Sequence, residues 1–356
     1  MAVPTPQSPT PQVSRSFLDN TIDFAPGVVL SALVAGAAYI AAPYVAKALP
    51  IPAMVLALVI GIALNPLASQ PAVKPGMAFC VRTLLRWAVA LLGLRVALSD
   101  IAALGLTTGV LVVVSMIVTL WSGFVFARMG GRHAGFGALV GSATAVCGAS
   151  AALATSTVVP DYPGKQADIA FVVVAVNALA TVAMVIYPPL CLLLGFDGQT
   201  TGVMLGGTIH DVAQVVGAGY AVSEPVGNTA VIVKLFRVFL LLPVVLGIGW
   251  YFTQAGVKHG EARVPVPVFA LVFLALCFLN SALPLLPAVA PVALPLKKAL
   301  IEISNWGLLI AIGALGLGTS ISTIIALGWR HVMTVIATSV VIFAIITGGL
   351  LAERLF

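Results

Sequence analysis

Long uncharged hydrophobic runs follow one another along almost the whole chain and are separated by short loops. A helix needs about 20 mainly apolar residues to cross the hydrocarbon core of a bilayer. By that measure the chain has eleven hydrophobic segments, at residues 26–46, 51–67, 79–98, 104–128, 135–157, 168–194, 200–222, 227–252, 265–283, 299–318 and 330–352. The short loops leave no room for a soluble domain. We therefore expect one all-α polytopic membrane domain over residues 26–356.

The shortage of charge supports this class. Only 8% of the 356 residues are charged and 61% are hydrophobic, whereas soluble domains carry about 25% charged residues. Such a chain cannot cover a water-soluble globule with polar side chains, which excludes a soluble enzyme. The net charge of +6 comes from Lys and Arg scattered at the ends of hydrophobic runs. We therefore expect a lipid bilayer as the surroundings and no nucleic acid as a partner.

The two ends of the chain also carry signals. Residues 1–25 begin with a stretch rich in Pro, Ser and Thr that lacks the basic start of a signal peptide, and we expect a disordered, uncleaved tail there. The distribution of Lys and Arg over the short loops favours an N-terminus inside the cell and a C-terminus outside.

Two of the eleven segments do not look like plain membrane spans. Segment 135–157 is dense in Gly, Ala, Ser and Thr, and segment 200–222 places His210 and Asp211 beside two glycines. Small residues are typical of tightly packed transmembrane helices. They also allow a helix to break and expose its backbone to a ligand inside a protein-lined cavity. We expect breaks near Cys147–Gly148 and near Gly207–Asp211 that face each other at mid-membrane depth.

Two internal similarities indicate a repeat. Leu92–Gly105 aligns without gaps with Leu315–Gly328, with eight of fourteen positions identical, and Gly137–Gly148 aligns more weakly with Gly202–Ala213. Internal repeats are characteristic of secondary transporters. If segments two to six form the first copy, the second copy is circularly permuted. If all eleven segments crossed the membrane, the segments of the first alignment would run antiparallel and those of the second would run parallel. Both alignments can therefore relate inverted copies only if a segment is re-entrant or miscounted.

The breaks hold the best candidates for chemistry. Ionisable side chains at membrane depth are costly and mark functional sites, so we expect Asp211 to bind the coupling ion and His210 to bind an anion or relay protons. The predicted substrate-binding set consists of Ser142, Thr144, Gly148, Ala149, Ser150, Asn177, His210, Gln214 and Arg95. Structural roles in packing or in satisfying the broken backbone are the alternative for each of them.

The positions of the remaining Lys and Arg side chains predict either a role in an anion site or a place at the membrane interface. Arg95 is the favoured cation of an anion site because it precedes a turn of the repeated segment, with Lys234 second. As a first interpretation, Lys234 and Arg237 snorkel to the membrane interface, and Arg82 and Arg86 anchor their helix there. The chain has no Walker, Rossmann, HExxH or GxSxG motif and no Cys/His ligand spacing. We expect no enzymatic activity, no cofactor and no metal site.

Three stretches, LLGLRVALSDI (91–101), VCGASA (146–151) and TIHDVAQVVGAG (208–219), resemble the YeiH-like family of bacterial inner-membrane proteins, which carries the label of sulfate exporters. That family is similar to the group of cation/proton antiporters and bile-acid/sodium symporters. The resemblance implies a bacterial inner-membrane location and two discontinuous helices that cross at the site, at Gly148–Ser150 and at His210–Gln214.

These features lead to one main hypothesis and three alternatives. The main hypothesis is a secondary transporter of a small anion, such as sulfate or an organic sulfonate, coupled to H⁺ or Na⁺ and working by alternating access. A cation/proton antiporter that uses Asp211 as its carrier is the alternative within transport. A membrane-embedded enzyme and a regulatory membrane subunit are the alternatives outside it. A homodimer is compatible with the large apolar faces.

Overall fold

The computed structural model describes residues 17–45, 53–254, 268–285, 290–318 and 329–353. Within these residues every regular element is a helix, and eight helices are long and apolar enough to cross a membrane. The predicted all-α polytopic membrane fold is therefore confirmed. The first helix begins at Phe17, inside the stretch that we assigned to the tail, because apolar residues start to recur there.

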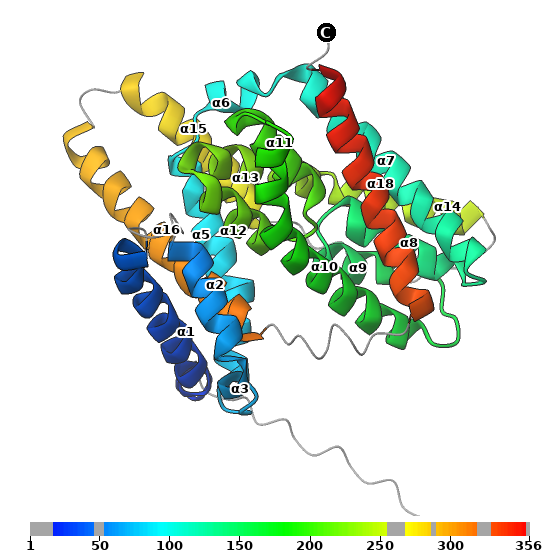
Figure 1. Ribbon diagram of the computed structural model, residues 1–356, viewed down its shortest axis with the longest axis horizontal. Helices are drawn as coiled ribbons and strands as arrows, with labels where there is room; N and C mark the ends of the chain where they lie inside the picture. Colours follow the sequence, from blue (N-terminus) through cyan, green and yellow to red (C-terminus); the bar gives the residue numbers. More distant parts are fainter. Residues whose placement is uncertain (1–16, 46–52, 255–267, 286–289, 319–328, 354–356) are drawn as a thin grey trace, which may run out of the picture.

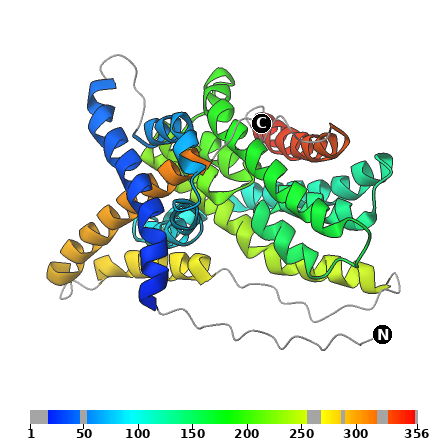
Figure 2. The same cartoon turned by 90° about the horizontal axis from the view of Figure 1, so that it is seen from below.

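The helices form two bundles that lie side by side (Figures 1 and 2). The α1 bundle contains α1 (Phe17–Val45), α2 (Ala53–Ala63), α3 (Asn65–Ala68), α4 (Lys74–Phe79), the π-helical turn η1 (Cys80–Leu84), α5 (Leu85–Leu91), the 3-10 turn η2 (Leu92–Leu94), α6 (Leu98–Ala103), α15 (Val268–Ala282), η3 (Leu283–Leu285) and α16 (Ala290–Gly318). The hairpin bundle contains α7 (Gly105–Met129), α8 (Ala134–Ala145), α9 (Ala149–Ser156), α10 (Lys165–Leu193), α11 (Gly198–Thr208), α12 (Val212–Val222), α13 (Glu224–Phe239), α14 (Leu241–Gln254) and α18 (Trp329–Glu353).

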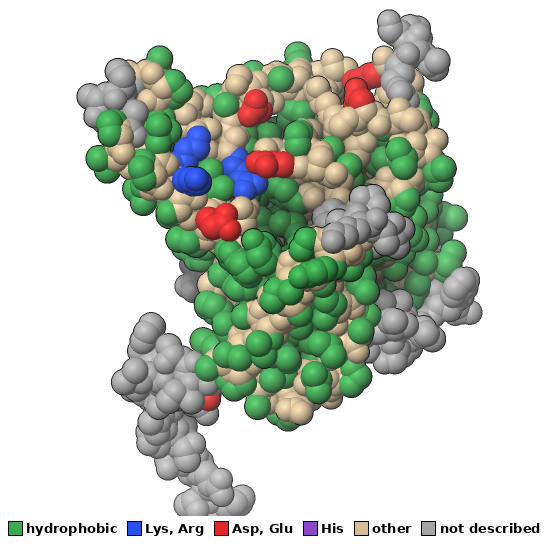
Figure 3. Space-filling model, turned by 60° about the vertical axis from the view of Figure 1, so that its left-hand side comes forward, with side chains coloured by type: hydrophobic (Ala, Val, Ile, Leu, Met, Phe, Trp, Pro, Cys, Tyr) green, Lys and Arg blue, Asp and Glu red, His purple; other side chains and the backbone are tan. Residues whose placement is uncertain are grey.

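The outer surface matches a bilayer. Many large hydrophobic side chains are exposed on the outside of both bundles, such as Leu106, Leu193 and Val292. Figure 3 shows a face on which hydrophobic side chains predominate, with most of its visible Lys, Arg, Asp and Glu side chains toward one end. Apolar side chains on the surface cost nothing in lipid, so this surface is the expected one.

The span from Lys74 to Leu94 defines the two faces of the molecule. Its 21 residues rise about 31 Å as a helix, which is about the thickness of the hydrocarbon core. We call the end at its start the Lys74 face and the opposite end the Arg95 face. The first helix starts on the Lys74 face and the last helix ends on the Arg95 face (Figure 1). The start of α1 and the end of α18 therefore lie on opposite faces.

The first suspected broken segment enters and leaves on the Lys74 face. The ring centroids of His133, just before α8, and Tyr162, after α9, lie 4.9 Å apart. Arg132 also donates a 2.6 Å hydrogen bond to Asp168 at the start of α10. The 12 residues of α8 rise about 18 Å, which is just over half of the hydrocarbon core. Helices α8 and α9 therefore form a re-entrant hairpin.

The second suspected broken segment is re-entrant from the Arg95 face. Gln199, at the start of α11, donates a hydrogen bond to the carbonyl of Ala103, and Glu224, which follows α12, pairs with Arg95. The 11 residues of α11 also reach only to about the middle of a bilayer. The expected breaks are thus present, but the two segments turn back at mid-depth and do not cross the membrane.

Two re-entrant hairpins reconcile the sequence repeat with the topology. In the described part of the chain, eight of the eleven predicted segments contain a helix long enough to cross the membrane: α1, α4–η2, α7, α10, α13–α14, α15, α16 and α18. The shorter α2 continues into α3, and residues 53–68 together rise about 24 Å and return the chain to the Lys74 face. The hairpins enter from opposite faces, so the α8–α9 and α11–α12 pair is inverted. The span ending at Leu94 and α16 also run in opposite directions. The permuted copies are therefore inverted throughout, although residues 319–328 of the second alignment lie outside the described residues.

Equivalent contacts support this inverted repeat. The α2 helix packs against α16, and α15 packs against α5 and η2, so each copy supplies one member of each pair. At the end of α2, Asn65 donates a 2.7 Å hydrogen bond to Leu317 O. At the end of α15, Asn280 donates a 3.1 Å hydrogen bond to Val96 O. The same side chain thus caps the end of the neighbouring span at opposite faces of the molecule.

Candidate functional site

The tips of the two hairpins meet in the middle of the hairpin bundle. Helix α8 ends at Ala145 and α9 begins after Gly148, whose φ of +66° and ψ of −127° suit glycine alone. A Cβ atom at Gly148 would lie 3.5 Å from His210 O and 3.7 Å from Asp211 Cβ. The prediction that the two breaks face each other at mid-depth is therefore confirmed.

Two cations of α13 hold the broken backbone together. Lys234 Nζ donates hydrogen bonds to Val146 O at 2.7 Å, Ile209 O at 3.0 Å and His210 O at 2.5 Å. These carbonyls lie where α8 and α11 end and have no helical partner. The positive charge also faces the negative ends of both half-helices. Lys234 thus ties one hairpin tip to the other.

Arg237 binds the same two helix ends one turn further along α13. It donates to the carbonyls of Thr144 and Ala145 in the first hairpin and of Gly206 and Ile209 in the second, at 2.8–3.2 Å. Neither Lys234 nor Arg237 has any exposed side-chain surface. The snorkelling interpretation is therefore wrong, because the broken helices offer these cations carbonyl acceptors at membrane depth.

Asp211 and His210 lie at the tip of the second hairpin but face different neighbours. Asp211 is the N-cap residue of α12 and accepts a 2.9 Å hydrogen bond from Ala213 N. His210 Nε2 lies 2.7 Å from Ser339 Oγ of α18, and the Ser339 hydroxyl donates to Val335 O. Nε2 is thus the donor to Ser339, and Nδ1 is left as a buried acceptor without a partner.

The small residues of the first hairpin are mostly used within it. Thr155 donates to Ser142, and Thr144 donates to the carbonyls of Val140 and Gly141. Ala149 and Ser150, at the start of α9, are only partly buried. Of the predicted set in this hairpin, Ala149 and Ser150 are therefore the residues that lie at an accessible helix start, directly after the buried Gly148.

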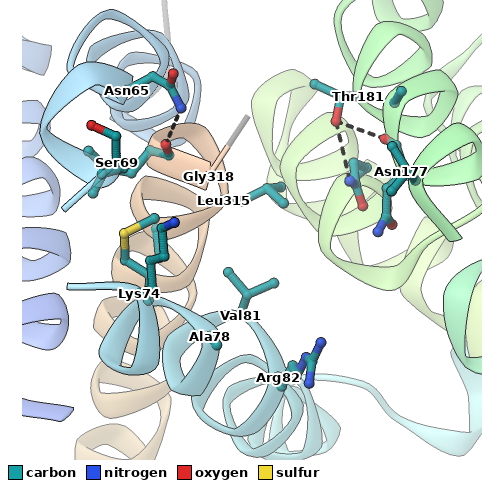
Figure 4. A pocket seen from close by; sticks show the side chains of 17 residues that line it. Asn65, Ser69, Lys74, Ala78, Val81, Arg82, Asn177, Thr181, Leu315 and Gly318 are labelled. Carbon is teal, nitrogen blue, oxygen red and sulfur yellow. Dashed lines mark hydrogen bonds between the residues drawn. The ribbon is translucent and has the colours of Figure 1, made fainter. Parts of the chain in front are cut away.

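A cavity of about 620 Å³ opens between the two bundles in the half of the molecule nearer the Lys74 face (Figure 4). Its α1-bundle wall comes from α3, α4, η1 and the end of α16, and its hairpin-bundle wall comes from α10 and α12. Asn177 and Gln214, both predicted site residues, line it together with Thr181. Gln214 is 1% exposed, donates to Thr181 Oγ1 at 3.4 Å, and leaves its Oε1 atom without a partner.

Two cations line this cavity, and sequence reasoning did not place them there. Lys74 and Arg82 both contribute to its wall, and neither forms a hydrogen bond or ion pair with a described residue. Arg86, four residues beyond Arg82, acts electrostatically on Asp211. Their spacing in the sequence resembles that of interface anchors. Only the neighbouring hairpin bundle makes their environment a cavity.

Arg95 lies at the other face, away from the cavity. It forms a 3.1 Å ion pair with Glu224 at the start of α13 and a 2.6 Å hydrogen bond with Asn305 of α16. We call these three residues the Arg95 network. Since Glu224 belongs to the hairpin bundle and the other two belong to the α1 bundle, the network bridges the bundles. The structure thus separates Arg95 from the other predicted site residues.

The proteins that this chain resembles all belong to one family of membrane proteins. A family model described as conserved hypothetical protein 698 matches residues 26–335. The UPF0324 membrane protein TauZ of Paracoccus pantotrophus is 42% identical over 341 residues, which cover 95% of this chain and 97% of that protein. The UPF0324 membrane protein CT0845 of Chlorobaculum tepidum is 38% identical, covering 91% and 88%. The UPF0324 inner membrane protein YeiH of Escherichia coli is 33% identical, covering 92% of each chain. No solved structure matches.

Proposed function

This chain belongs to the UPF0324 family of membrane proteins, and we propose that it is a secondary transporter of a small anion that works by alternating access. It is a multi-pass inner-membrane protein, as the resemblance to the YeiH-like family implied. One observation carries the proposal: a cavity lined by two cations leads from one face toward the centre of the molecule, while the matching entrance on the other face is bridged.

The position of the cavity fits one state of an alternating-access cycle. It lies between the two bundles and ends at Gln214, one turn beyond the tip of the second hairpin. Residues at a mid-membrane interface between inverted repeats are where secondary transporters bind substrate. Movement of one bundle against the other would close this entrance and open its symmetric counterpart.

The inverted repeat identifies that counterpart. In the alignment of Leu92–Gly105 with Leu315–Gly328, Arg95 takes the place of Gly318. Gly318 lines the open cavity, whereas Arg95 bridges the bundles through Glu224 and Asn305. At these two equivalent positions, Gly318 therefore lies at an open entrance and Arg95 at a closed one.

The charges support an anion as substrate. Lys74 and Arg82 line the cavity, and no Asp or Glu lines it among the described residues. Asp211 lies at the hairpin tip, where Arg86 and Lys234 act on its carboxylate electrostatically. A carboxylate at membrane depth beside a moving site can take up a proton or Na⁺, so we assign the coupling ion to Asp211.

Flux into proteoliposomes tests the proposal. We expect the purified protein to accumulate labelled sulfate or a short organic sulfonate when a pH or Na⁺ gradient is imposed. Asp211→Asn should abolish the gradient-driven part and leave a folded protein, because Asn caps a helix as well as Asp does. Gradient-driven uptake by Asp211→Asn at the wild-type rate over pH 6–8 would remove the coupling role. Cation/proton exchange without anion flux would favour the antiporter alternative.

A further inference from the structure

The cavity has a composition that an inorganic ion does not require. Besides Lys74 and Arg82, its wall presents apolar side chains from both bundles, at Val81, Val174 and Leu315. Its volume of about 620 Å³ falls within the range of about 300–1,000 Å³ typical of small-molecule sites. A bare tetrahedral oxyanion would leave most of that space and all of the apolar wall unused.

From this arrangement we propose that the cavity binds a small organic oxyanion, whose charged group is held by Arg82 with Lys74 and whose carbon chain contacts the apolar wall. The inference deepens the proposed function and rests on it for the identification of the ligand as a transported substrate. It names a binding cation different from Arg95, which pairs with Glu224, and Lys234, which donates to backbone carbonyls. It also differs from His210, which donates to Ser339.

Arg82 is the residue best placed to select an oxyanion. It lies eight residues along the span from Lys74, so it stands about 12 Å deeper in the membrane. A cation at that depth without a partner is costly, and a bound anion would supply the missing partner. A guanidinium also offers paired N–H donors that match sulfonate, sulfate or carboxylate oxygens. The span carrying it is locally widened by the π-helical turn η1, a feature frequent at functional sites.

The opposite end of the cavity supplies a second sign of a missing ligand. Gln214 is almost fully buried and lines the cavity, yet its Oε1 atom has no hydrogen-bond partner. The Thr181 hydroxyl donates to Asn177 O, so it receives the Gln214 amide N–H and cannot also donate to it. Gln214 Oε1 is thus a buried acceptor at the cavity wall that a ligand hydroxyl or a ligand-bound water could satisfy.

Equilibrium binding to purified protein in nanodiscs tests the inference with four probes: sulfate, methanesulfonate, propanesulfonate and butyrate. We expect propanesulfonate to bind more tightly than methanesulfonate, because each added methylene that contacts the apolar wall should increase the affinity about fourfold. Arg82→Gln should weaken binding of all organic oxyanions tenfold or more. Arg128→Gln is the matched control, because Arg128 is an exposed arginine at the Lys74-face end of α7 that does not line the cavity.

A second variant tests the contribution of the ligand's carbon chain to the affinity. Val174 lies on the cavity wall and is 37% exposed, so Val174→Ser should not disturb the core. It should reduce the advantage of propanesulfonate and leave methanesulfonate affinity unchanged. Unchanged affinity in Arg82→Gln, or sulfate bound as tightly as propanesulfonate, would overturn the inference while flux of the wild-type protein could still uphold the proposed transporter. Binding as expected without any flux would instead refute the transporter and retain the site.

Discussion

At the residue scale, the fully buried cations are the clearest case of a role that depends on the fold. Lys234 and Arg237 sit on one face of α13 at a spacing of three residues, and both donate only to backbone carbonyls. A charge in a low-dielectric interior costs several kcal/mol unless it is fully satisfied. Here it is satisfied by the ends of two broken helices, so Lys234 replaces the backbone hydrogen bonds that the breaks removed.

Lys234→Met is therefore expected to destabilise the protein by about 3 kcal/mol or more, because three carbonyls lose a charged donor at membrane depth. Thermal denaturation in detergent, followed by loss of the monodisperse species, measures this. Lys74→Met makes the same substitution at an exposed lysine of the cavity and should leave the denaturation temperature nearly unchanged. Equal stability of the two variants would show that the hairpin tips hold together without Lys234.

At the element scale, the sequence predicts where the helices break but not where they go. Glycine and small residues at 135–157 and 200–222 mark the breaks, which the structure places at Gly148 and Ile209–Asp211. Hydropathy is the same for a segment that crosses the bilayer and for one that turns back inside the protein. The return of each hairpin is fixed by long-range contacts, such as Arg132 with Asp168, which no local pattern encodes. The cavity-lining position of Arg82 also depends on long-range packing against the hairpin bundle, so the local sequence did not predict it.

Labelling of single cysteines tests the re-entrant topology. We expect Gly131→Cys and Asp161→Cys, before and after the first hairpin, to react with a membrane-impermeant maleimide from the same side. Gln199→Cys and Val222→Cys should both react from the opposite side. All four native cysteines are buried, so background labelling should be low. If Gly131→Cys and Asp161→Cys react from opposite sides, the first hairpin spans the membrane and the re-entrant topology is wrong.

At the scale of the whole molecule, the inverted repeat relates an open entrance to a closed one. The two copies pack with equivalent contacts at Asn65 and Asn280. The cavity that reaches Gln214 nevertheless lies toward the Lys74 face, whereas the Arg95–Glu224 pair bridges the bundles at the Arg95 face. Two states of a transporter must lie within a few kcal/mol of each other for both to be visited. A weak bridge is suited to that balance, and the exposed Glu224 side chain makes the Arg95 pair a weak one.

Arg95→Gln removes an ion pair that contributes up to about 1 kcal/mol, which corresponds to about a fivefold shift between the two states. Asn177→Cys, on the cavity wall, should react with impermeant maleimide mainly from the Lys74 face in the otherwise wild-type protein. In the Arg95→Gln background its labelling from the Arg95 face should rise about fivefold, because the symmetric entrance opens more often. The charge-swapped pair Arg95→Glu with Glu224→Arg should restore the wild-type pattern. If labelling from the Arg95 face stays at the wild-type level in Arg95→Gln, the Arg95 network does not close that entrance, and other contacts between the bundles must do so.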